Sequence, residues 1–134
     1  MPTINLLKKR TVKDRQYKPQ NDTPNQWARE CYNTSRWRKL RESQLIENPL
    51  CEMHLMYDKV EPATCVHHIN EVSNAGSRLE AMDMAFDGNN LMSLCEECHQ
   101  KYHAITHSVH SISGEDLVFI NKYKELCNKK SGNQ

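Results

Sequence analysis

The sequence is poor in the residues that build a large apolar core. Only 37% of its 134 residues are hydrophobic, and only 7% are aromatic. A small domain buries little surface on folding, and a bound structural metal is one way to supplement its packing. The chain has no apolar run long enough to cross a bilayer, which excludes a membrane-spanning protein. It also has no internal repeat and no low-complexity block, so that its length predicts one domain with a tail at each end.

The charges are distributed unevenly, although the net charge is only +1. Residues 1–45 carry 11 Lys and Arg against 4 Asp and Glu, whereas residues 46–134 carry 7 against 13. A basic first half on a near-neutral chain predicts contact with a polyanion such as nucleic acid. The alternative is a basic tail that only aids solubility.

The pattern along the chain predicts three parts: a basic, flexible arm over residues 1–30, a main domain over 31–107, and a C-terminal helix and tail over 108–134. Asn48-Pro49 ends the first helix, since the residue before a proline disfavours the helical region. Trp37, Leu40 and Leu45 are expected on the buried side of that helix. The predicted elements are a helix from Thr34 or Ser35 to Ile46, short strands between Lys59 and Ile69, a short helix near 79–84, a helix over 95–103, and a last helix after Ser113 with Leu117, Ile120, Tyr123 and Cys127 on one face.

Four metal-ligating residues occur in two short hooks, Cys51-x-x-His54 and Cys95-x-x-Cys98. Two hooks that each offer two ligands are typical of a closed, tetrahedral zinc site. Six cysteines without a recognisable secretion signal also favour a reducing, cytoplasmic compartment and metal ligation rather than disulfides. Two alternatives stay open: the cysteines are buried free thiols, or Cys65 or another histidine takes the place of His54. The remaining cysteines, Cys31 and Cys127, lack a matching partner spacing and are interpreted as ordinary thiols.

A second group of histidines is left over after this site is filled. His99 and His103 are four residues apart, so that on a helix both imidazoles face the same way and can hold one ion. His67 and His68 are adjacent on a predicted strand, where successive side chains point to opposite faces. One of them can therefore bind metal while the other acts as a base. His107 and His110 are expected to be exposed to solvent.

Three segments carry a resemblance to a known family: Val66-His67-His68-Ile69, Gly88-Asn89-Asn90-Leu91, and the stretch from Leu94 to His99. Their order resembles that of the HNH endonucleases, also called ββα-metal nucleases, over about residues 32–106. The resemblance implies an α+β fold, a small ββα-metal core with a zinc knuckle and flanking helices. The stretches 36–41 and 48–51 resemble the phage and prophage branch of the family.

The chain departs from that branch at two positions. The branch usually carries Asp where His67 stands and Cys where His54 stands. The second change leaves a workable zinc ligand. The first makes the reactive site resemble that of the colicin nucleases, which also have an Asn followed by His-x-x-x-His, here Asn90, His99 and His103.

The resemblance also implies roles for the site residues. His68 would act as general base on a water, and Asn90 would brace the loop that holds this base or enter the metal shell. His67, His99 and His103 would hold one divalent ion that stabilises the transition state, leaving 5′-phosphate and 3′-hydroxyl ends. Three imidazoles favour a transition ion, but Mg²⁺, Mn²⁺, Ni²⁺ and Zn²⁺ all stay open.

The expected substrate is DNA, nicked or cut through both strands with weak intrinsic sequence specificity. The predicted phosphate contacts come from the basic helix, through Arg36, Arg38, Lys39 and Arg41; a solvated helix face is the alternative. In the phage branch such proteins often act beside the packaging terminase, so that a terminase is an expected partner. A non-catalytic zinc module that docks on DNA or protein is the rival interpretation, and a nuclease toxin delivered outside the cell is a third. The sequence leaves the oligomeric state open.

Overall fold

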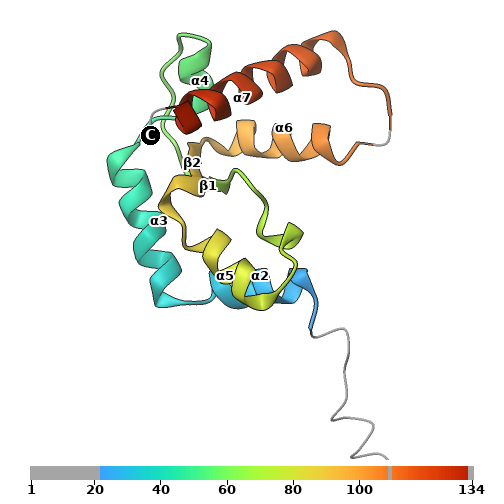
Figure 1. The fold of residues 1–134 in the computed structure, drawn as a ribbon. Coiled ribbons are helices and arrows are strands. Elements are labelled where there is room, and N and C mark those ends of the chain that lie inside the picture. Colours follow the sequence, from blue (N-terminus) through green and yellow to red (C-terminus); the bar gives the residue numbers. More distant parts are fainter. Residues whose placement is uncertain (1–21, 109, 133–134) are drawn as a thin grey trace, which may run out of the picture.

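The computed structural model describes residues 22–108 and 110–132, and its centre is a two-stranded antiparallel sheet followed by a helix (Figure 1). Strand β1 (Cys65–His68) pairs with β2 (Leu91–Leu94), with Cys65 opposite Leu94 and His68 opposite Leu91. Helix α6 (Glu96–Thr106) follows β2 after a single residue. The predicted fold class, an α+β protein with a small ββα core and flanking helices, is confirmed.

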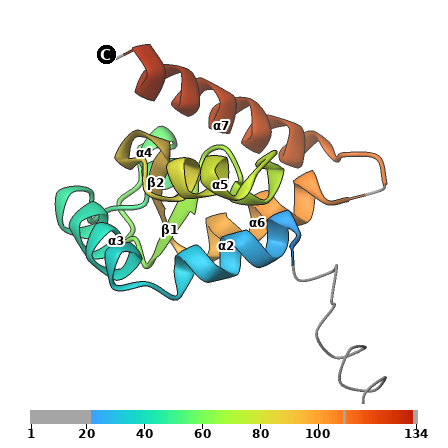
Figure 2. The same ribbon diagram turned by 60° about the horizontal axis from the view of Figure 1, so that its bottom comes forward.

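The flanking helices surround this core on several sides. Figures 1 and 2 place α7 on the opposite side of the sheet from α2. Within the described part of the chain, no helix is both long enough and apolar enough to span a membrane. The helices are α2 (Pro24–Tyr32), α3 (Ser35–Glu47), α4 (Glu52–Met56), α5 (Arg78–Ala85) and α7 (Gly114–Gly132), with single 3₁₀ turns η2 (Val72–Asn74) and η3 (Gly88–Asn90).

Local sequence signals account for most of the helix ends. The backbone N–H of Trp37 donates to the Thr34 side chain, which caps α3 as predicted. Asn48-Pro49 ends this helix. Trp37 is buried, whereas Leu40 and Leu45 are half-buried. The last three predicted helices also occur, with α5 at Arg78–Ala85, α6 extending three residues beyond the predicted end, and α7 beginning at Gly114.

Several local predictions need correction. Helix α2 begins at Pro24, within the segment assigned to the arm, because Ala28 and Cys31 pack against α5 and η2; residues 1–21 lie outside the described residues. The first hook overlaps a short helix, α4, which the sequence pattern did not predict and which begins directly after Cys51. Around Pro62 the chain forms only an isolated bridge to Leu50, so the predicted strands reduce to β1. Leu117, expected on the buried face of α7, is 52% exposed.

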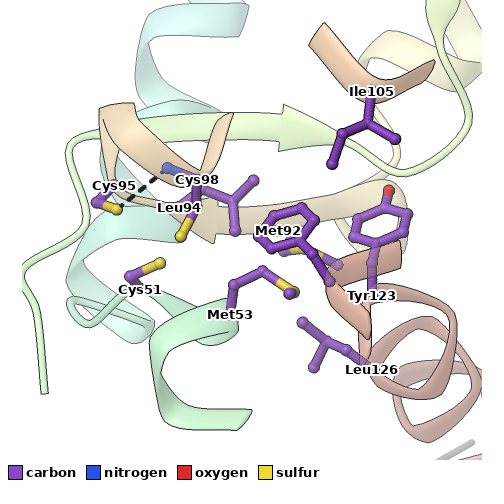
Figure 3. Close-up of a cluster of buried hydrophobic side chains, with 10 residues drawn as sticks. Cys51, Met53, Met92, Leu94, Cys95, Cys98, Ile105, Tyr123 and Leu126 are labelled. Atoms are coloured by element: carbon purple, nitrogen blue, oxygen red, sulfur yellow. Dashed lines mark hydrogen bonds between the residues drawn. The ribbon is translucent and has the colours of Figure 1, made fainter. Parts of the chain in front are cut away.

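The buried side chains form two clusters that hold different parts of the molecule. The first lies between α4, β2, α6 and α7, and includes Met53, Met92, Leu94, Tyr123 and Leu126 (Figure 3). The second is made mainly of small side chains and joins α2, η2 and α5. The first cluster therefore fixes α6 and α7 against the sheet, and the second fixes α2 beside α5 (Figure 2).

Candidate metal centres and active site

The two predicted hooks meet in space. Ligand atoms of Cys51, His54, Cys95 and Cys98 all lie within 4.8 Å of one another. The His54 Nδ1 atom is 3.3 Å from the Sγ of Cys51, 3.5 Å from that of Cys95 and 3.3 Å from that of Cys98. Tetrahedral zinc with its usual bond lengths separates a sulfur and a nitrogen ligand by about 3.5 Å. The four residues therefore fit a tetrahedral ion of this kind, and the residue that lies with the three cysteines is His54, not Cys65.

Helix starts hold these ligands in place. Cys51 immediately precedes α4 and His54 follows inside it, whereas Cys95 caps α6 by accepting a hydrogen bond from the Cys98 backbone N–H (Figure 3). All three thiols are buried. A hydrogen bond with Cys98 lowers the pKa of Cys51, whereas that contact raises the pKa of Cys98 and burial raises that of Cys95. A cation would replace these competing protons and favour the thiolate at all three positions.

A second group of three histidines lies on the sheet and on α6. Ring nitrogens of His67, His99 and His103, one from each residue, lie within 4.8 Å of one another. The Nε2 atoms of His99 and His103 are 3.1 Å apart. Burial, followed by the neighbouring imidazoles, lowers the pKa of His67 to about 3, and burial also lowers the pKa of His99. Neutral imidazoles carry a free lone pair, so this set is suited to a transition ion or another divalent cation.

His68 has different partners from His67, as expected for adjacent strand residues. Its Nε2 lies 3.0 Å from the backbone oxygen of Ala85. A carbonyl oxygen can only accept, so that Nε2 carries the proton and Nδ1 keeps its lone pair in the neutral ring. That Nδ1 lies 3.4 Å from the Tyr32 hydroxyl. The ring stacks on Trp37 with a centroid separation of 4.9 Å, and burial lowers the pKa of His68. The arrangement fixes one tautomer of a neutral imidazole.

Asn90 braces the segment that orients His68. Its side-chain oxygen accepts from the backbone N–H of Asn70 at 2.8 Å, and its amide nitrogen donates to the carbonyls of Asn70 and Met84. Met84 directly precedes Ala85, whose carbonyl holds the imidazole. Of the two roles expected for Asn90, these contacts favour bracing over a place in the metal shell.

One cleft of about 820 Å³ is lined by His68 and by the three clustered histidines, His67, His99 and His103. Among the four predicted phosphate-binding residues, Arg41 lines this cleft and donates to the Thr64 carbonyl at 3.1 Å. Arg36 instead lies over the ring of Phe86, at 4.3 Å. Two further residues of the cleft wall, which the sequence did not single out, are Arg29 and Tyr32 on α2. Arg38 and Lys39 lie exposed on the same helix as Arg41.

The other candidate residues lie beside the cleft or away from it. Glu71, His103 and His107 form a looser group, with Glu71 Oε1 at 3.8 Å from His103 Nδ1 and 4.0 Å from His107 Nε2. His107 and His110 are both exposed, as predicted. The Tyr123 hydroxyl, which sequence reasoning missed as a site residue, lies 2.8 Å from His67 Nε2.

A ββα core that brings three imidazoles close enough to share an ion, with a fourth histidine lining the same cleft, has the features of a metal-dependent nuclease. Two comparisons agree with this class. The model of the HNH endonuclease family matches residues 51–104. The crystal structure of the HNH endonuclease of the deep-sea thermophilic bacteriophage GVE2, solved with manganese, is 31% identical with a TM-score of 0.53, and the match covers 62% of this chain and 85% of that one. No curated protein matches the sequence.

The chain belongs to the HNH endonuclease family. Membership decides between the interpretations left open by the sequence, since it makes the protein a nuclease rather than a non-catalytic docking module. The expectation of a phage-related, metal-binding endonuclease is confirmed by the phage enzyme and the two ligand clusters.

Proposed function

We propose that the protein hydrolyses phosphodiester bonds in DNA, with His68 as the general base. The observation that carries the proposal is the hydrogen bond from His68 Nε2 to the Ala85 carbonyl. It leaves Nδ1 as the basic atom, and His68 lines the same cleft as the three-histidine cluster. A base must lie within hydrogen-bond reach of the water that it deprotonates, directly beside the reacting phosphate.

In this mechanism a phosphate of the substrate lies in the cleft between His68 and the three-histidine cluster. His68 Nδ1 takes a proton from a water, and the water oxygen attacks phosphorus as the bond to the 3′ oxygen breaks. The leaving 3′ oxygen takes a proton from solvent. The products are a 5′-phosphate and a 3′-hydroxyl. Asn90 and Trp37 keep the imidazole in place throughout, the first through the 84–85 backbone and the second by stacking.

His67, His99 and His103 would hold the catalytic ion. A divalent ion bound there supplies positive charge that stabilises the charge developing on the phosphate oxygens and on the leaving group. Three nitrogen ligands favour a transition ion over Mg²⁺, and the similar phage enzyme was crystallised with manganese. We propose Zn²⁺ for the other cluster, because three thiolates and one imidazole are soft ligands that leave no open position. Terminase as a partner and a cytoplasmic location stay predictions from the resemblance and the composition.

Plasmid cleavage tests the proposed function directly. In the presence of Mn²⁺, wild-type protein should convert supercoiled plasmid to nicked or linear DNA. Parallel reactions contain Mg²⁺, Ni²⁺ or Zn²⁺, and a reaction with EDTA is the metal-free control. His103→Ala removes one of three ligands and should reduce the rate at least about 100-fold at low Mn²⁺. His110→Ala, an exposed histidine outside both clusters, should cleave like wild type. Intact plasmid with wild-type protein under every ion would contradict the proposal.

Arg41 should contribute to DNA affinity more than its neighbours on α3 do. Of the four predicted phosphate-binding residues on α3, Arg41 alone lines the cleft. Arg41→Ala should therefore weaken DNA binding and reduce the number of counterions released on binding by about one. Fluorescence anisotropy across a salt series, without divalent cleavage cofactor, measures both quantities. Arg38→Ala is the matched control, because Arg38 is exposed and lies outside the cleft. Equal losses in the two variants would mean that α3 binds DNA through diffuse charge alone.

A further inference from the structure

The C-terminal helix reaches the histidine cluster although it lies outside the segment matched by the family model. That segment ends at residue 104, whereas α7 spans Gly114–Gly132. The Tyr123 hydroxyl lies 2.8 Å from the Nε2 atom of His67. Both side chains are buried, with exposed fractions of 7% for Tyr123 and 2% for His67. Figure 3 shows Tyr123 on its helix, extending from the core cluster with its hydroxyl at the far end of the ring.

This contact restricts how His67 can bind an ion. An imidazole has two nitrogens, and in the neutral ring one carries a proton while the other has a free lone pair. A nitrogen with a hydroxyl oxygen 2.8 Å away has no room for a cation in the same direction. The nitrogen left for a cation is therefore Nδ1. Binding through Nδ1 requires the proton on Nε2, which then donates to the oxygen of Tyr123.

The surroundings of Tyr123 are compatible with this direction of the hydrogen bond. Burial raises the pKa of Tyr123, so that the hydroxyl keeps its proton at neutral pH. A protonated phenol oxygen still keeps lone pairs that can accept a hydrogen bond. The oxygen of Tyr123 is thereby free to accept from His67.

We propose that Tyr123 is a positioning residue for the catalytic metal site: its hydroxyl accepts the Nε2 proton of His67 and so presents Nδ1 to the ion. Partners of this kind fix the ring orientation and the tautomer of a ligating histidine, and their removal usually weakens metal binding about 10–100-fold. The proposal rests on the proposed function, because it takes the three-histidine cluster as the site of the catalytic ion. It makes α7 part of the functional unit rather than only a cover for the core.

Tyr102 offers a matched control for this idea. Its ring packs edge-on against His67 with a centroid separation of 4.7 Å, and it lies 4.4 Å from the ring of Tyr123. It therefore shares the aromatic environment, but the hydroxyl at hydrogen-bond distance from His67 belongs to Tyr123. Changing either tyrosine to phenylalanine removes one hydroxyl from the same cluster and keeps the ring.

The experiment is a titration of the zinc-loaded, full-length protein with Mn²⁺ alone, in which electron paramagnetic resonance measures the free ion. Tyr123→Phe should raise the Kd for Mn²⁺ about 10–100-fold, while Tyr102→Phe should change it less than threefold. Zinc content and circular dichroism confirm that each variant is folded. Unchanged Mn²⁺ affinity in Tyr123→Phe, or equal losses in the two variants, would overturn the positioning role.

A second measurement needs no variant and is decisive if Tyr123→Phe fails to fold. Long-range ¹H–¹⁵N NMR spectra of the wild-type protein, with zinc but without Mn²⁺, report which nitrogen of His67 is protonated. The Nε2–H tautomer is expected, and the Nδ1–H tautomer would overturn the proposal. Wild type that binds no exchangeable Mn²⁺ would refute the proposed function and the positioning role together. The positioning role alone would be refuted if the wild type binds Mn²⁺, His99→Ala does not, and Tyr123→Phe binds it as tightly as the wild type.

Discussion

His68→Ala should reduce DNA cleavage by about 10²–10⁴-fold, the usual contribution of a general base. The reason is the fixed tautomer: the Ala85 carbonyl accepts the Nε2 proton, and this leaves Nδ1, 3.4 Å from the hydroxyl of the cleft residue Tyr32, as the basic atom. The change removes no ligand of either proposed ion. Initial rates of plasmid nicking at saturating Mn²⁺ measure the loss.

Two further measurements separate loss of the base from loss of the site. Mn²⁺ affinity and DNA affinity of His68→Ala should stay within about threefold of wild type, because the three-histidine cluster and Arg41 are untouched. His110→Ala, an exposed histidine, serves as the control for a general effect of removing an imidazole. If the variant still cleaves at more than about a tenth of the wild-type rate, His68 is not the general base.

Much of the site could be predicted from the sequence because its residues are close along the chain. Within the two hooks and along α6, spacings of three and four residues already determine which side chains can meet. The resemblance to the HNH family then supplied the link between strand, loop and helix. Both clusters form from the expected residues, while their chemical roles stay predictions.

The missed residues approach the site from distant parts of the chain. Tyr123 is 56 residues from His67, and Tyr32 is 36 residues from His68. No spacing rule connects such positions, and a buried tyrosine on an amphipathic helix is ordinary core by pattern alone. Arg29 was missed for a related reason, because its helix lies in a stretch that the polar composition assigned to the arm.

The position of strand β2 could not be predicted from the pattern of its residues, because they do not alternate between buried and exposed. All four residues of Leu91–Leu94 are buried, including Ser93. Ser93 is paired with polar groups: its backbone N–H donates to Glu52 and its hydroxyl accepts from Gln44. A short, fully buried run cannot be assigned to strand or helix from periodicity. The pairing of β2 with β1, together with its contacts with α3 and α4, decides the outcome.

Helix α6 contributes residues to both candidate ion sites. Cys95 caps it and Cys98 lies in its first turn, and both contribute to the closed cluster. His99 and His103 follow on the same helix and contribute to the open cluster. Because Cys98 and His99 are adjacent, a movement of the start of α6 on loss of an ion from the closed cluster would also move the His99 ligand of the open cluster. We therefore expect an ion in the closed cluster to stabilise the geometry of the open one.

Cys98→Ser should consequently abolish zinc retention, most of the thermal stability and, with them, cleavage. Structural zinc contributes about 10–16 kcal/mol of apparent binding free energy in small domains at neutral pH, which is comparable to the whole stability of an ordinary domain. Cys98 lies in the main core cluster beside Met53 and Leu94, so that its loss also disturbs the packing of α4 and β2. We expect the variant to be largely unfolded at room temperature and to show no cooperative unfolding transition on heating. Elemental analysis and calorimetry are the measurements.

The matched control is Cys65→Ser, because Cys65 is a half-buried free thiol that belongs to neither cluster. It should keep one zinc per chain and a transition close to that of wild type. Stripping zinc from the wild-type protein with a strong chelator should reproduce the Cys98→Ser result, and adding zinc back should restore the folded state and Mn²⁺ binding together. If Cys98→Ser kept its zinc and its transition, the closed cluster would not stabilise the fold. Cleavage that persisted in the zinc-stripped protein would mean that the reactive site does not depend on the closed cluster.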